Sequence, residues 1–105
     1  MVFRLPPRPE GYGAYHAAEI QYVFPRESTI YFGAPFTAAQ RALSNRMVGY
    51  WAQFAKTGNP NAAGSSAWPA YTASNDSFLN LAPAGDGINT QFAVQHKCAL
   101  WTPGV

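Results

Sequence analysis

The clearest pattern of apolar and polar positions lies between residues 38 and 57. Apolar side chains recur there at i, i+4, i+7/i+8 and i+11, and they belong to Leu43, Met47, Tyr50, Trp51 and Phe54. This spacing places them on one face of an α-helix. We therefore predict a helix Ala38–Thr57 and expect its apolar face to be core rather than a cofactor site.

Both ends of this helix carry boundary signals. Thr37 and Gln40 fit the T-x-x-Q capping box, in which each side chain accepts a hydrogen bond from the other residue's amide. Gly58 stands where a left-handed residue often ends a helix, and Pro60 prevents continuation. A glycine inside a helix costs about 1 kcal/mol relative to alanine, so we expect Gly49 to mark a close packing contact.

Shorter apolar segments precede the helix. Residues 2–5 alternate apolar and charged side chains and predict a short strand that the following prolines end. Residues 19–24 fit either a short helix or a buried strand, because periodicity over six positions does not separate the two. Residues 27–36 predict an irregular connection with three aromatic side chains expected to pack or to form a pocket wall: Tyr31, Phe32 and Phe36.

The chain after the helix predicts a hairpin and a final helical turn. Residues 68–71 read as a packed extended segment. Residues 78–81 alternate as a strand, residues 83–87 supply turn chemistry, and residues 88–92 are expected to return as the second arm. Residues 92–101 predict a short helix or helical turn.

The composition is typical of a segment rich in core residues and not of a well-solvated small domain. The 105 residues allow one domain at most, and charged residues make up only 11% of them, against about 25% in typical domains. We expect part of the surface to lie against another surface. A net charge of +2 without a basic stripe argues against nucleic acid. No apolar run approaches the ~18 residues of a membrane span, and residues 1–7 contain no signal-peptide core, so the localisation stays open.

The candidate chemistry centres on His16. This imidazole follows a glycine-rich loop, and Glu19 lies three positions later, an arrangement that suits a general base with a nearby carboxylate. The alternative is an ordinary loop histidine. His96 is expected to be exposed or structural. The two distant histidines and Cys98 lack metal-ligand spacing, so we expect no metal and no cofactor.

Four stretches, in order, resemble the type-B carboxylesterases, the family that includes the cholinesterases. They are residues 13–24 (GAYHAAEIQYVF), residues 43–61 (LSNRMVGYWAQFAKTGNPN), residues 68–71 (WPAY) and residues 96–101 (HKCALW). Ala17 replaces a usual glycine and Asn59 a usual aspartate. The resemblance implies an α/β-hydrolase fold, a Ser–Glu/Asp–His triad with His16 as its histidine, and carboxylic esters cleaved through an acyl-serine.

The other parts of such a site are missing from the sequence. In α/β-hydrolases the order along the chain is serine, acid, histidine. No G-x-S-x-G is present, since residues 64–68 (GSSAW) lack the second glycine, and no Gly-Gly-Gly segment is present either. We therefore expect residues 1–105 to be one C-terminal segment of an α/β-hydrolase fold. Glu19 would then support the base, because the family's triad acid lies further upstream.

Cys98 and Asn75 carry further expectations. As the single cysteine, Cys98 reads either as a small buried apolar residue or, by the resemblance, as half of a disulfide whose partner lies upstream. In the second case it would be able to form intermolecular disulfides. Residues 75–77 (NDS) fit the glycosylation sequon, which matters in a eukaryotic secretory context.

Three functional hypotheses follow. The chain is the C-terminal part of a carboxylic ester hydrolase and supplies His16 to an upstream catalytic portion. Alternatively, it is a free-standing minimal esterase with an improvised nucleophile such as Ser28 or Ser44. The third hypothesis is a non-catalytic module that self-associates as a homo-oligomer, since an unpaired sheet edge is a template for pairing.

Overall fold

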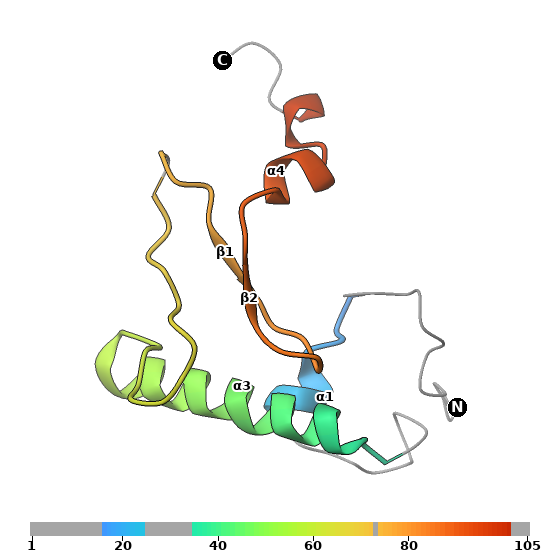
Figure 1. The fold of residues 1–105 in the computed structure, drawn as a ribbon, viewed down its shortest axis with the longest axis vertical. Helices are drawn as coiled ribbons and strands as arrows, with labels where there is room; N and C mark the ends of the chain where they lie inside the picture. The colour runs from blue at the N-terminus through green and yellow to red at the C-terminus, as the bar shows by residue number, and fades with distance from the viewer. Residues whose placement is uncertain (1–15, 25–34, 73, 102–105) are drawn as a thin grey trace.

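A computed structural model describes residues 16–24, 35–72 and 74–101. In chain order the elements are α1 (Ile20–Val23), α3 (Ala38–Thr57), β1 (Phe78–Asn80), β2 (Gly87–Asn89), α4 (Phe92–Gln95) and the 3-10 helix η1 (Cys98–Leu100). Figure 1 shows that the turn between β1 and β2 lies beside α3. Helix α4 lies at the opposite end of this hairpin (Figure 1). The predicted strand 2–5, Ser28, Tyr31 and Phe32 lie outside the described residues.

Helix α3 has the predicted bounds, and local chemistry sets both ends. The Gln40 amide donates to Thr37 Oγ1 at 3.2 Å, and the Thr37 amide donates to Gln40 Oε1 at 2.8 Å. Gly58 has a φ of 74°, and its amide donates to Phe54 O at 2.7 Å. The capping box and the left-handed cap are thus both confirmed.

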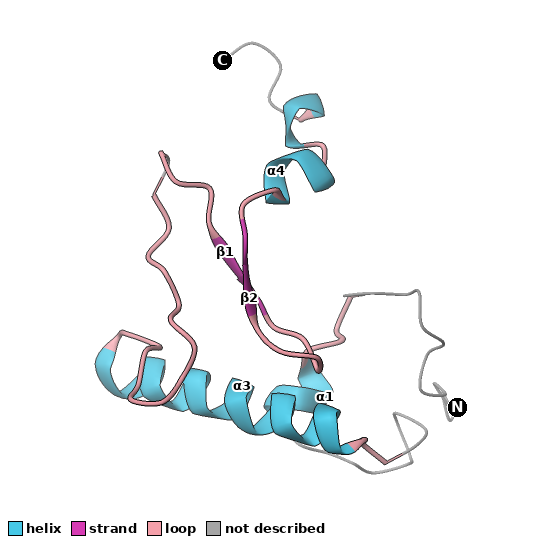
Figure 2. Cartoon of the chain, in the orientation of Figure 1, coloured by secondary structure: helices cyan, strands magenta, loops and turns pink. Residues whose placement is uncertain are grey.

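The apolar face of α3 is only partly buried. Phe36, Leu43, Met47 and Tyr50 form the buried apolar core of the described residues, whereas Trp51 is 43% exposed and Phe54 58% exposed. The expectation that the whole face is core is wrong for these last two residues. The physical reason is coverage. Among the described residues, α1 and the hairpin turn lie over the first part of α3, and the chain that follows α3 folds back beside its C-terminal part (Figure 2).

Gly49 does not mark close packing, and that expectation is wrong as well. A Cβ atom built at this position meets no heavy atom within 4 Å, and the residue is exposed. Gly49 lies on the side of α3 that faces solvent, so the glycine serves no contact among the described residues.

The segment after His16 is a helix, not a strand. Helix α1 packs against α3, and the Tyr22 ring stacks on Phe36 with centroids 4.9 Å apart and planes 13° apart. Ala17, where the family usually has glycine, takes a positive φ of 67°. A non-glycine residue in this region is strained by roughly 1–2 kcal/mol. The backbone there thus keeps a conformation that suits glycine.

Strands β1 and β2 form the predicted antiparallel hairpin, with Leu79 opposite Ile88. The second arm ends at Asn89 and is shorter than the expected 88–92, because Phe92 already begins α4. The Phe92 ring stacks on Phe78 at 4.3 Å and joins α4 to the hairpin. The predicted helical turn at residues 92–101 is confirmed as α4 followed by η1.

Candidate functional site

His16 lies on an exposed turn that leads directly into α1. The Ile20 amide donates to Ala17 O at 3.3 Å, and the Val23 amide donates to Glu19 O at 2.9 Å. Glu19 occupies the N-cap position of α1 without a side-chain capping bond and is exposed. Within residues 16–24, 35–72 and 74–101, no hydrogen bond or ion pair joins His16 to Glu19. The turn therefore brings both groups to one end of α1 and leaves the imidazole accessible.

Two serines of the described residues, Ser44 and Ser65, use their hydroxyls in structural hydrogen bonds. Ser44 is 2% exposed, and its Oγ donates to Tyr22 O at 2.7 Å. Ser65 Oγ donates to Ala62 O at 2.8 Å inside the loop after α3. A serine nucleophile must reach the substrate carbonyl and give its proton to a base. Ser44, one of the two nucleophiles considered for a minimal esterase, does neither.

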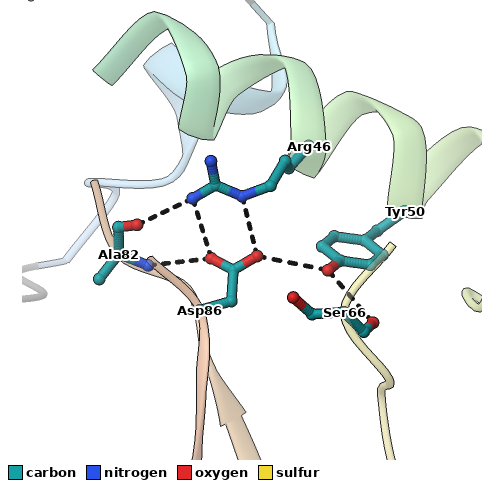
Figure 3. A network of polar contacts seen from close by, with 5 residues as sticks. All are labelled: Arg46, Tyr50, Ser66, Ala82 and Asp86. Atoms are coloured by element: carbon teal, nitrogen blue, oxygen red, sulfur yellow. Dashed lines mark hydrogen bonds and ion pairs between the residues drawn. The ribbon is translucent and has the colours of Figure 1, made fainter. Parts of the chain in front are cut away.

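A charged network joins α3 to the hairpin turn (Figure 3). Arg46 Nε donates to Asp86 Oδ2 at 2.9 Å and Arg46 Nη2 donates to Asp86 Oδ1 at 3.1 Å. Arg46 Nη2 also donates to Ala82 O at 2.9 Å. The Tyr50 hydroxyl lies 3.3 Å from Asp86 Oδ2 and 3.4 Å from Ser66 O. The network thus ties three segments of chain together at one point.

Burial and pairing act in opposite directions on Asp86, whose side chain is 0% exposed. Burial alone would raise the pKa of this carboxyl. The hydrogen bonds from Arg46 and the Ala82 amide, the charge of Arg46 and the Tyr50 hydroxyl outweigh it and lower the pKa below its ordinary 3.8. Sequence reasoning missed this pair, since 40 positions separate its members. The sequence signal that pointed toward such a pair was the small number of acidic residues, five in the chain.

An aromatic groove of about 700 Å³ lies along the C-terminal part of α3, with Trp51, Phe54 and Trp68 among its lining residues. Trp68 is held there because its amide donates to Asn61 Oδ1 at 2.6 Å and its carbonyl accepts from Asn61 Nδ2 at 3.0 Å. The groove is formed by residues 50–70 and does not include His16. It leaves a strip of apolar surface open on α3.

The other candidate residues of the sequence lie in the C-terminal third of the chain, at exposed or half-buried positions. His96 is exposed and stacks on Phe92 at 4.1 Å, as expected of a structural or exposed histidine. Cys98 is half-buried at the start of η1. Asn75 is exposed, and its Oδ1 accepts from Ser77 Oγ at 2.6 Å. These residues do not converge with His16 on one site.

The part of the chain that the structure describes contains no group of three or more histidine, cysteine, aspartate or glutamate side chains able to hold a metal ion. None of its helices is both long and apolar enough to cross a membrane.

Comparisons with known proteins agree with this arrangement. The sequence model of the carboxylesterase family matches residues 2–101. Bile salt-activated lipase from Bos taurus is 37% identical over 81 residues, which are 74% of this chain and 13% of that protein. Acetylcholinesterase from Bungarus fasciatus is 39% identical over 100 residues, which are 89% of this chain and 15% of that protein.

A solved PNB esterase structure is similar with a TM-score of 0.75 and 27% sequence identity. The similarity covers 95% of this chain and 20% of that one, so the described elements form part of an α/β-hydrolase fold. This chain thus spans 13–20% of the length of these three proteins. Because the family match runs through nearly all 105 residues, the chain belongs to the carboxylesterase family.

Proposed function

We propose that this chain is the C-terminal segment of a carboxylic ester hydrolase and that His16 is its general base. The observation that carries the proposal is the family match over residues 2–101, which includes the motif around His16. In an acyl-serine mechanism, His16 takes the proton of the serine during attack and returns it to the leaving alcohol. An exposed imidazole at the start of α1 suits that exchange, because both proton partners come from outside this chain.

Glu19 is proposed as a supporting carboxylate beside the base. It lies on the same turn, exposed and without a capping bond, so it is available to another part of the site. The orienting acid and the oxyanion hole would come from the upstream portion. The hydrogen-bond donors of an oxyanion hole stabilise the transition state by several kcal/mol. The isolated chain is therefore expected to have little or no activity.

The proposed partner is that upstream catalytic portion. Trp51 and Phe54 expose apolar rings along α3, and Trp68 extends the same surface through its ring contact with Trp51 at 6.1 Å. An apolar strip of this kind favours contact with another protein surface. The proposed substrate is a small carboxylic ester. This proposal follows the family and the names of the similar proteins, which are a lipase, an acetylcholinesterase and an esterase.

The test is reconstitution. The 105-residue chain is co-expressed with a PNB esterase portion that lacks the region similar to this chain, and hydrolysis of p-nitrophenyl acetate is measured. We expect the complex to be active and His16→Ala to lower kcat by about 10⁴-fold or more, as removal of a triad histidine does. His96→Ala is the matched control and should leave kcat unchanged. An active complex that is indifferent to His16→Ala would exclude the proposed role.

A self-associating module is the second candidate, and the same exposed rings favour it. The homo-oligomer would bury Trp51 and Phe54 against a second copy. Sedimentation of the purified chain distinguishes the two, because a well-behaved monomer that binds the upstream portion rules out the module. Esterase activity of the chain alone that disappears in His16→Ala would instead support a minimal esterase.

A further inference from the structure

Ser44 is one of the most deeply buried residues in the described part of the protein. It is 2% exposed and comes from the second turn of α3. Its hydroxyl does not bond within its own helix but donates to Tyr22 O of α1 at 2.7 Å, across 22 positions of sequence. A short hydrogen bond between two elements, shielded from water, fixes their relative position.

A second contact also holds Tyr22 of α1. The Tyr22 ring stacks on Phe36 at 4.9 Å, and Phe36 is buried immediately before the capping box of α3. The backbone of Tyr22 is therefore fixed by Ser44 and its ring by Phe36. Both holding groups belong to α3 or its N-terminal flank, so α1 follows α3 as one unit.

The turn that carries His16 is continuous with α1. Glu19 O accepts from the amides of Tyr22 and Val23, each at 2.9 Å, and the Ile20 amide closes the turn onto Ala17 O. Only six positions separate His16 from Tyr22. A shift of α1 is therefore transmitted to the imidazole through hydrogen-bonded backbone rather than through a loose loop.

We propose that Ser44 is a positioning residue for the catalytic base: its hydroxyl fixes α1 on α3 and thereby fixes His16. This inference rests on the proposed function, because it concerns the same base. Its effect would fall on kcat rather than KM, since Ser44 is buried and its hydroxyl is bonded to α1. A displacement of about 1 Å in a catalytic group lowers the rate by up to about 10²-fold.

The experiment compares Ser44→Ala with Ser77→Ala. Ser77 is the matched control because it is also buried, at 7% exposure, and its hydroxyl bonds locally to Asn75, far from α1 in sequence. In the reconstituted complex we expect Ser44→Ala to lower kcat about ten- to hundredfold with KM changed less than twofold. Ser77→Ala should keep both values, and Ser44→Thr, which retains the hydroxyl, should recover most of kcat.

Hydrogen exchange of the 105-residue chain gives a second readout that needs no activity. In Ser44→Ala the amides of Val23 and Phe24 should exchange at least about tenfold faster, while the α3 amides near Met47 keep their rates. Unchanged exchange in α1 together with unchanged kcat would overturn the inference. If His16→Ala has no effect while α1 exchange still accelerates, the proposed function fails and the tether to α1 stands.

A variant that does not fold leaves the question testable. Should Ser44→Ala be insoluble, Ser44→Cys replaces the hydroxyl with a weaker thiol donor in a side chain of similar shape. The expected result is an intermediate loss of kcat and intermediate exchange of the Val23 amide. Wild-type values for both measurements in the folded Ser44→Cys variant would contradict the positioning role.

Discussion

The ion pair between Arg46 and Asp86 gives the sharpest prediction of stability. Asp86→Ala removes a carboxylate that is 0% exposed and that accepts two hydrogen bonds from Arg46, one from Tyr50 and one from the Ala82 amide. The Arg46 side chain stays 32% exposed, so water reaches part of the guanidinium after the substitution. The energetic cost of the substitution therefore lies between that of losing a buried ion pair and that of losing a surface ion pair.

The magnitude follows from those two limits. Breaking a fully buried pair costs about 3–5 kcal/mol, and an exposed pair is worth about 0.2–1 kcal/mol. With the carboxylate buried and Arg46 one-third exposed, we expect Asp86→Ala to lower the free energy of unfolding by about 2–3 kcal/mol. For a chain of this size, each kcal/mol lowers Tm by about 4–8 °C.

The assay is urea unfolding at neutral pH, followed by tryptophan fluorescence. Trp68 reports on the same region, because its ring packs edge-on against Tyr50 at 5.2 Å, and Tyr50 belongs to the network. The control is Asp76→Ala, which removes a half-buried carboxylate with no ion pair among the described residues. A double-mutant cycle with Arg46→Met isolates the coupling between the two charged groups.

The reasoning is refuted if Asp86→Ala and Asp76→Ala destabilise the chain equally, within about 0.5 kcal/mol. A coupling energy near zero between Arg46→Met and Asp86→Ala would have the same meaning. In that case the pairing of Arg46 with Asp86 would contribute nothing to holding the hairpin turn on α3.

Four further variants test the pH dependence of Asp86 and the interior and two ends of α3. Because the folded pKa of Asp86 lies below its ordinary value of 3.8, its contribution is complete above that pH and is lost as the pH falls through the lower folded value. Acid unfolding of Asp86→Asn should lack this component. Gly49→Ala should stabilise the protein by up to about 1 kcal/mol in urea unfolding, since the site is an open helix interior. Gly58→Ala should destabilise it by about 1 kcal/mol, since φ is +74° there. Changes of the same sign in the free energy of unfolding for Gly49→Ala and Gly58→Ala would contradict this account. Thr37→Ala removes the capping box and should cost about 1 kcal/mol, measured by thermal melting. An equal loss in Thr37→Ser, which keeps the capping hydroxyl, would exclude a role for the cap.

Features fixed by neighbouring residues were predictable from the sequence. The bounds of α3 follow from Thr37, Gln40 and Gly58, whose hydrogen bonds and backbone angles involve residues no more than four positions away. The hairpin follows in the same way from its alternating first arm and its turn. His16 was singled out by its motif, and its role as a base stays a prediction.

Features that depend on distant contacts were decided by the tertiary structure. The six residues 19–24 allowed helix or strand, and the contacts of Tyr22 with Ser44 and Phe36 accompany the helical choice. The pairing of Arg46 with Asp86 joins groups 40 positions apart, and no periodicity along the chain records it.

The apolar face of α3 shows the same limit. A helical repeat determines which side chains share a face, so the alignment of Leu43, Met47 and Phe54 was contained in the sequence alone. It does not determine how much of that face another element covers. Burial is a property of two surfaces in contact, and only the packing of α1 and the hairpin turn left Leu43 buried and Phe54 58% exposed.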